Sequence, residues 1–215
     1  MNAWSTFTHF GNSTVMLSVA VIITIWLMTG SAWRMAFWWC VLFGAGLLIV
    51  LATKIAFVGW GIGIRDLDFT GISGHAMRAT AVMPVMLYLM LQNTRRPLLV
   101  AGVLLGLLFG VLIGISRLVV NVHSISEVVA GCLLGGIISI VFLLIAAPLP
   151  KPAIRWWYIG LSLIVMLGAS RAEPVPSQRW VRDVSLYLAG HDRPYIRATW
   201  KMAPVLRKAP IDADV

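Results

Sequence analysis

The stretch LLVAGVLLGLLFGVLIGISRLVVNVHSISEVVAGCLLG, residues 98–135, decides the fold. Two long apolar runs flank a short polar patch, and neither run alternates as a strand would. Because lipid admits only helices and closed barrels, both runs are expected to be membrane helices. Ionisable groups are costly near a bilayer and commonly mark function there. The polar patch contains Ser116, Arg117, His123 and Glu127.

Composition extends this interpretation to most of the chain. Of 215 residues, 60% are hydrophobic and 12% are charged, about half the charged fraction of soluble domains. Six apolar segments fall near 13–30, 36–57, 79–92, 98–115, 126–147 and 154–170. We therefore expect an all-α, polytopic membrane bundle of about six transmembrane helices. The third and sixth segments are short for a crossing, so we expect them to extend into flanking polar sequence.

The net charge of +9 comes from 17 basic and 8 acidic residues. On a membrane protein this charge reports orientation and anionic headgroups, so we expect no nucleic-acid partner. Five basic residues and no acid lie in one set of loops: Arg34, Arg95, Arg96, Lys151 and Arg155. The positive-inside rule makes that face cytoplasmic. The polar patch then faces outward, which in a bacterial inner membrane is the periplasmic side.

A polar segment ends the chain. Residues 1–170 are expected to form the membrane domain, and residues 171–215 a polar tail with eight basic and five acidic residues. With six crossings the tail lies outside. If 154–170 lay in the membrane interface, the chain would cross five times and the tail would be cytoplasmic. We favour six crossings.

Small residues predict how the helices pack. Gly102, Gly106, Gly110 and Gly114 recur every four residues and form one smooth stripe along a helix. Such a stripe lets a neighbouring backbone approach closely, and we favour packing inside the bundle over a dimer seam. Both cysteines, Cys40 and Cys132, lack the spacing of a metal site and are interpreted as buried thiols. A disulfide framework is not indicated.

His123 and Glu127 are four residues apart, so on a helix they share one face. A carboxylate bonded to one imidazole nitrogen fixes the tautomer and leaves the other nitrogen free as a nucleophile or base. Arg117 adds a planar fork that matches phosphate oxygens. The alternative, a surface His-Glu pair, is disfavoured beside a membrane helix with an arginine near.

Two further clusters could join them. Ser73-Gly74-His75 precedes the third apolar segment, where a hydroxyl, a helix N-terminus and an imidazole suit an anion. A plain N-cap is the commoner meaning of such a tripeptide. Lys54 could bind phosphate or extend to the lipid headgroups. Arg65 and Arg78 have the same two interpretations as Lys54. Asp66 and Asp68 are expected to solvate the loop or to balance nearby cations, because two carboxylates without further oxygen ligands are thin evidence for a divalent metal site.

These residues resemble the type 2 phosphatidic acid phosphatase (PAP2) superfamily of membrane phosphatases, over roughly residues 50–135. That family carries the motifs K-x6-R-P, P-S-G-H and S-R-x5-H-x3-D. The third matches from Ser116 to Glu127, with Glu in place of Asp. The second matches at 72–75, with Ile72 in place of Pro. In the first, Gly61 stands where Arg is expected, and Arg65 is a candidate substitute.

The resemblance implies a role for each residue. His123 would attack phosphorus to give a phosphohistidine, oriented by Glu127, while His75 would protonate the leaving oxygen and later activate water. No metal or other cofactor is required. The remaining residues would bind the phosphate: Lys54, Ser73, Gly74, Arg117 and the candidate Arg65.

The expected function is hydrolysis of a lipid phosphate or diphosphate. Undecaprenyl diphosphate is favoured, with phosphatidic acid and phosphatidylglycerol phosphate close behind. One alternative is a phosphotransferase of the same fold, which would pass the phosphoryl group to another lipid such as lipid A. Another is a catalytically silent lipid-binding protein, since fold does not fix function. A transporter is disfavoured because the polar groups gather at one face.

Overall fold

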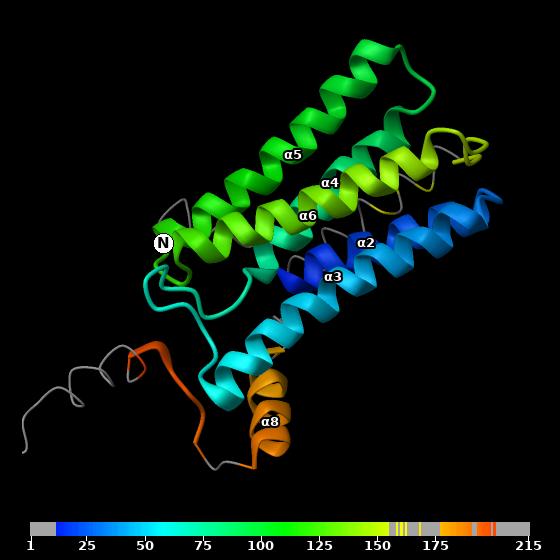
Figure 1. The fold of residues 1–215 in the computed structure, drawn as a ribbon. Coiled ribbons are helices and arrows are strands. Elements are labelled where there is room, and N and C mark those ends of the chain that lie inside the picture. The colour runs from blue at the N-terminus through cyan, green and yellow to red at the C-terminus, as the bar shows by residue number, and fades with distance from the viewer. Residues whose placement is uncertain are drawn as a thin grey trace, which may run out of the picture.

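The computed structural model describes residues 12–154, 177–190, 193–198 and 200, together with 158, 160, 162 and 168. Within these residues the regular structure is helical, apart from one isolated bridge between Ile64 and Phe69, and the all-α class is confirmed (Figure 1). The helices are α2 (Ser13–Thr29), α3 (Trp33–Trp60), α4 (Gly74–Leu91), α5 (Arg96–Val119), α6 (Ile125–Ala146) and α8 (Ser177–Ala189).

The first five predicted segments each correspond to one of these helices. As expected for a short segment, the third extends into polar sequence, because α4 begins at Gly74. Most of the predicted segment 154–170 lies outside the described residues.

Three helices are long and apolar enough to cross a membrane: α3 with 28 residues, α5 with 24 and α6 with 22. At 1.5 Å per residue they measure roughly 42, 36 and 33 Å, which exceeds the ~30 Å hydrocarbon core of a bilayer. Their outer faces expose large apolar side chains such as Leu105 (60%) and Leu133 (62%). Water would disfavour such surfaces and lipid would not, so the chain is an integral membrane protein.

Helix α4 lies at the centre and packs against α2, α5 and α6. The glycines of α5 face it: a Cβ on Gly106 would lie 2.6 Å from the Pro84 nitrogen, and one on Gly110 would lie 2.6 Å from the Thr80 Cα. In α6, a Cβ on Gly131 would lie 2.6 Å from the Ser73 carbonyl oxygen. Packing inside the bundle is thereby confirmed as the use of these glycines.

The prediction that both cysteines are buried is wrong. Cys40 is exposed and Cys132 is half-buried. The apolar setting of Cys40 reflects a helix face that meets lipid in place of protein, and sequence hydrophobicity does not distinguish the two environments.

One end of the bundle gathers the basic loops. The Lys151 ammonium donates to the Gln92 carbonyl at 2.6 Å, and the Gln92 amide donates to the Pro152 carbonyl at 3.1 Å. The Ala153 N–H reaches the Gly30 carbonyl at 3.4 Å. The loops before α3, after α4 and after α6 therefore meet at this end.

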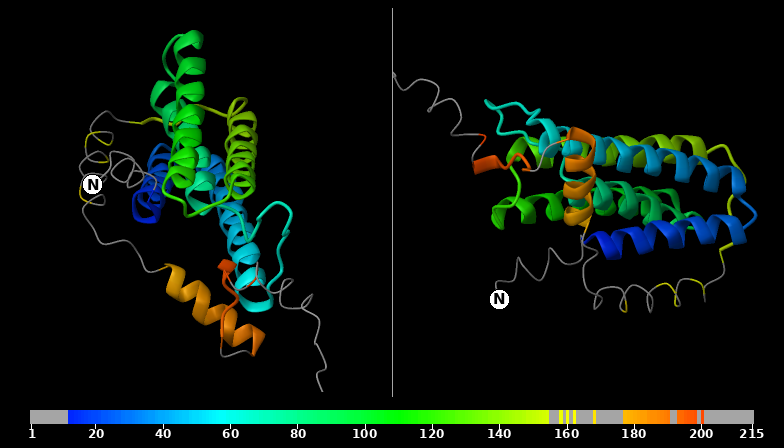
Figure 2. Two further views of the ribbon diagram at one scale, coloured as in Figure 1. Left: turned by 90° about the vertical axis from the view of Figure 1, so that its left-hand side faces the viewer. Right: turned by 90° about the horizontal axis from the view of Figure 1, so that it is seen from below.

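The C-terminal helix α8 packs at the opposite end. A Cβ on Gly59, near the end of α3, would lie 3.2 Å from the Ala189 Cβ and from the Ser185 carbonyl oxygen. Figure 2 shows α8 lying across the direction of the bundle helices. Residue 153 and helix α8 thus lie at opposite ends, as six crossings would require. The number of crossings itself stays a prediction.

Candidate active site

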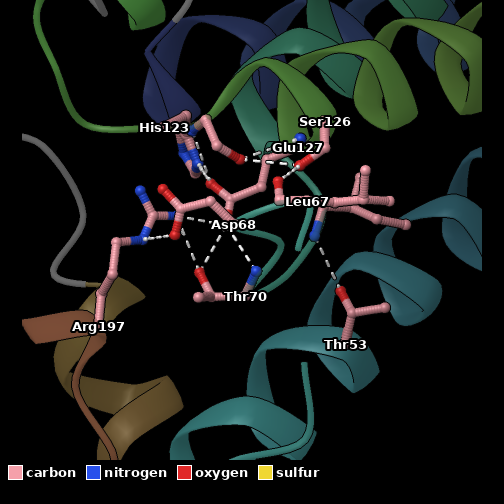
Figure 3. Close-up of polar contacts among 10 residues, drawn as sticks. Thr53, Leu67, Asp68, Thr70, His123, Ser126, Glu127 and Arg197 are labelled. Atoms are coloured by element: carbon pink, nitrogen blue, oxygen red, sulfur yellow. Dashed lines mark hydrogen bonds and ion pairs between the residues drawn. The ribbon is translucent and has the colours of Figure 1, made fainter. Parts of the chain in front are cut away.

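The site residues converge at the end of the bundle that is opposite the basic loops. Four helices contribute: the last third of α3, the first turn of α4, the end of α5 and the first turn of α6. The loop 61–73 joins α3 to α4 and runs beside the first turn of α6. Among the hydrogen bonds that hold it, the Ile72 N–H donates to the Thr53 hydroxyl at 3.2 Å. The Ser126 hydroxyl donates to the Leu67 carbonyl at 2.7 Å (Figure 3).

Ser73 stands at the N-cap position of α4, but its side chain makes no capping hydrogen bond. The residue is fully buried, and its hydroxyl has no hydrogen-bond partner among the described residues. A buried hydroxyl without a partner is costly unless a ligand satisfies it. Capping, the commoner use of a serine here, is therefore not what this side chain does. The Ser73 N–H instead donates to the Glu127 carbonyl at 3.0 Å, which ties α4 to α6.

His123 and Glu127 form a close pair at the start of α6. The His123 Nδ1 lies 2.6 Å from the Glu127 Oε2 (Figure 3). Ser124 begins the helix with a capping box: its N–H donates to the Glu127 Oε2 at 3.2 Å, and its hydroxyl accepts from the Glu127 N–H at 3.4 Å. The carboxylate therefore caps the helix and orients the imidazole. With Nδ1 engaged, Nε2 is the imidazole nitrogen left for chemistry.

The second oxygen of Glu127 is held by another part of the chain. The Thr70 N–H and hydroxyl donate to Oε1 at 2.8 and 2.5 Å. Arg197 donates to the same oxygen from its Nη2 at 2.5 Å. Only 1% of the Glu127 surface is exposed, so these donors compensate the burial of its charge.

Three cationic side chains gather beside the pair. The Lys54 ammonium lies within electrostatic range of Arg78, Arg117 and Glu127. The His75 imidazole interacts with the same three cations and with His123. Like charges repel when they are brought together out of water, so such a cluster favours an anionic ligand.

Two glycines make room for this cluster. Gly74 opens α4, and a Cβ there would lie 3.1 Å from the Arg78 Nη1. Gly71 has φ +148°, a conformation that favours glycine, and a Cβ there would lie 3.3 Å from the Lys54 Cγ. At these two positions the absence of a Cβ therefore lets the backbone lie close to the Lys54 and Arg78 side chains.

Most of the predicted site residues thus meet at this end: Lys54, Ser73, Gly74, His75, Arg117, His123 and Glu127. Arg65 is placed differently, because it is exposed and its guanidinium lies 5.3 Å from the centre of the Trp200 ring. Its phosphate-binding role stays a prediction, as do the catalytic and binding roles of the other residues.

Sequence reasoning missed Thr70 and Arg197 and left Arg78 ambiguous. Thr70 had a weak signal, since it directly precedes the Gly71–His75 stretch. Arg197 had none, because it follows Glu127 by 70 residues in a segment that reads as a polar tail. The part of the chain that the structure describes brings together no group of three His, Cys, Asp or Glu side chains able to hold a metal.

The structure thus defines a helical membrane protein in which a histidine–carboxylate pair lies beside clustered cations, an arrangement whose charge suits an anionic group such as phosphate. The chain matches the PAP2 superfamily over residues 53–151, which include every motif residue of the site. It is also 37% identical over 202 residues to a Klebsiella pneumoniae protein described as an uncharacterized 22.5 kDa protein in cps region. That match covers 90% of this chain and 95% of the relative. No solved structure matches.

The chain therefore belongs to the PAP2 superfamily, as its motifs indicated. Members of this family are phosphatases, and membership supports a phosphatase that acts on a lipid phosphate.

Proposed function

We propose that this protein hydrolyses a membrane lipid phosphate or diphosphate through a phosphohistidine on His123. The observation that carries the proposal is the His123–Glu127 pair, 2.6 Å apart, at the end of lipid-exposed helices and beside clustered cations. Phosphoryl transfer depends mainly on positioning and on stabilising charge on the phosphoryl oxygens, and this end of the bundle offers both.

The reaction takes two displacements. In the first, the Nε2 of His123 forms a bond to phosphorus as the bond to the leaving oxygen breaks, and His75 gives that oxygen a proton. In the second, His75 takes a proton from water as the water oxygen attacks phosphorus, which breaks the P–N bond and releases phosphate. His123 and His75 are then restored, and Glu127 keeps the Nδ1 proton hydrogen-bonded throughout.

The phosphoryl oxygens would be bound by Lys54, Arg117, the Ser73 hydroxyl and the Gly74 amide. The buried hydroxyl of Ser73, which has no hydrogen-bond partner among the residues that the structure describes, supports this role. We add Arg78 to the set, because its guanidinium lies against Gly74 and interacts with Lys54 and with His75. In this proposal Arg78 supplies the cation that the family motif would place at the position of Gly61.

We propose that the substrate is a lipid, because the site lies at one end of a helix bundle whose outer faces are apolar and exposed. A lipid tail could stay in the bilayer while its headgroup meets the cations. Undecaprenyl diphosphate is the favoured candidate, and phosphatidic acid and phosphatidylglycerol phosphate are tested beside it. We place the protein in a bacterial inner membrane with the site on the periplasmic side, because the basic loops gather at the other end.

The experiment is phosphate release from each of the three lipids by purified full-length protein in detergent, with and without EDTA. We expect release that survives EDTA and is abolished in His123→Ala. Labelled substrate should leave an acid-labile label on the wild-type protein and none on that variant. Arg96→Gln, at the basic end, is the matched control and should keep full activity.

The other outcomes separate the alternatives. An acid-labile label without phosphate release, followed by transfer to an added lipid such as lipid A, would establish a phosphotransferase. Release that stops with EDTA would contradict metal independence. Neither label nor release from any of the three lipids would overturn the proposal.

A further inference from the structure

The C-terminal segment reaches into the site through one side chain. Arg197 donates from Nη2 to the Glu127 Oε1 at 2.5 Å and to the Thr70 hydroxyl at 3.0 Å (Figure 3). Its Nε lies 3.6 Å from the Asp68 Oδ1. One guanidinium thus bridges the first turn of α6 and the loop 61–73, with its strongest contact on a carboxylate that is almost fully buried.

The contact is supported on both sides along the segment. The Tyr195 N–H donates to the Val58 carbonyl at 2.9 Å, and the Trp200 indole donates to the Gly61 carbonyl at 3.0 Å. The Trp200 ring also packs edge-on against Phe57, with ring centres 5.4 Å apart. Arg197 therefore lies in a segment that is hydrogen-bonded to the end of α3 by residues on both sides of it, Tyr195 and Trp200.

Its position on Glu127 gives Arg197 a specific task. The two carboxylate oxygens are divided: Oε2 faces His123 and the Ser124 N–H, while Oε1 faces Thr70 and Arg197. A glutamate side chain has one more rotatable bond than an aspartate, so more contacts are needed to hold its carboxylate in one orientation. Charge-assisted hydrogen bonds are the stronger kind, and Arg197 supplies one.

We propose that Arg197 is a positioning residue of the active site, which holds the Glu127 carboxylate in the orientation that serves His123. The segment 193–200 is then part of the catalytic end of the molecule, and the enzyme is incomplete without it. This inference rests on the proposed phosphatase function. It assigns no contact between Arg197 and the substrate.

The test is a double-mutant cycle in the full-length protein. Arg197→Ala should lower kcat about 10- to 100-fold, the equivalent of one lost charge-assisted hydrogen bond, and leave KM nearly unchanged. Arg197→Lys keeps the charge without the fork and should recover part of kcat. Arg193→Ala removes a charge from an exposed position of the same segment and should match wild type.

The decisive comparison uses Glu127→Gln. That variant should lower kcat much more than it raises KM, and adding Arg197→Ala to it should change kcat little further, because the two residues act as a unit. If the fold losses in kcat of the two single variants multiplied in the double variant, the inference would be overturned, because Arg197 would then act independently of Glu127. A rise in KM without a fall in kcat would also overturn it, by assigning Arg197 to substrate binding.

The four proteins of the cycle are the wild type, Arg197→Ala, Glu127→Gln and the double variant. They are also compared by thermal unfolding in detergent. Non-additive changes in melting temperature are expected whether or not a lipid is hydrolysed. Additive changes would show that the contact does not form. A wild-type protein that releases no phosphate from any lipid would overturn the proposed function, whereas an active wild type with additive losses would overturn this inference alone.

Discussion

At the scale of single residues, Glu127 explains how the chain accommodates its departure from the family motif. A glutamate stands where aspartate is expected, and its carboxylate accepts hydrogen bonds from five donor groups. The longer side chain can reach the Ser124 N–H of its own helix while it faces His123. The capping box is thus combined with the orienting role. The glutamate side chain is more flexible than an aspartate, and contacts from the loop 61–73 and from the C-terminal segment hold it in place.

The missing motif arginine leads to a prediction at the same scale. Arg78→Gln should lower kcat/KM about 100-fold, because a cation aimed at the phosphoryl group is removed. Arg65→Gln, which changes an exposed guanidinium over Trp200, should stay within a few-fold of wild type. The measurement is steady-state hydrolysis of the best lipid by both variants. If Arg65→Gln lowered kcat/KM much more than Arg78→Gln, the phosphate-binding role would be assigned to Arg65 and not to Arg78.

At the scale of helices, the central position of α4 depends on glycines of its neighbours. Helix α4 carries Ser73 at its N-cap and His75 in its first turn, so its placement against α5 and α6 sets the geometry of the site. Lipid supplies no hydrophobic drive for helices to associate, so close packing of small residues must do so. The glycine stripe of α5 therefore shapes the proposed site indirectly, because it lets α4 pack closely against the helix that carries Arg117.

This packing can be tested with a matched pair of alanines. Gly110→Ala would place a Cβ 2.6 Å from the Thr80 Cα, which is backbone and has little freedom to move. We expect Gly110→Ala to lower the free energy of unfolding by about 1–3 kcal/mol. Each kcal/mol corresponds to a fall in melting temperature of roughly 2–4 °C. Gly44→Ala meets no atom within 4 Å and should leave the melting temperature unchanged or slightly higher. Thermal unfolding in detergent measures both, and equal losses would contradict the packing argument.

At the scale of the whole molecule, the two ends of the bundle have different chemistry. At one end, Gln92 and Lys151 join the loops after α4 and after α6, and the bond from the Ala153 N–H to the Gly30 carbonyl adds the loop before α3. The other gathers the site, the loop 61–73 and the described part of the C-terminal segment. The described part of the predicted tail 171–215 therefore contacts the membrane domain through α8, Tyr195, Arg197 and Trp200.

The orientation of these ends is tested by labelling single cysteines in intact cells. With Cys40 and Cys132 replaced by alanine, a cysteine at Thr94 should resist a membrane-impermeant thiol reagent. Cysteines at Asp66 and Asp183 should react. All three positions are exposed, so permeabilised cells should label each one. Labelling of Thr94 alone would place the site in the cytoplasm, and protection at Asp183 with reaction at Asp66 would contradict six crossings.

Much of the molecule follows from local sequence. The apolar segments predict the helices because backbone groups in lipid must be satisfied within each segment. The four-residue spacing predicts that His123 and Glu127 lie close together. In the structure His123 precedes α6, which begins at Ile125, and the contact forms beside the capping box of Ser124. The positions of the basic residues predict that their loops share an end. These features depend on residues within one segment, or on the fact that successive membrane helices place every second loop at the same end of the bundle.

Other features were decided by the tertiary structure. The contact of Arg197 with Glu127 joins residues 70 positions apart, and nothing in the polar segment around Arg197 signals a partner. The placement of Arg78 inside the cation cluster, with Arg65 on the Trp200 ring, also depends on how α4 and the C-terminal segment pack. Local periodicity determines helices and the contacts within them. Contacts between distant segments depend on shape and charge that become complementary only after the chain has folded.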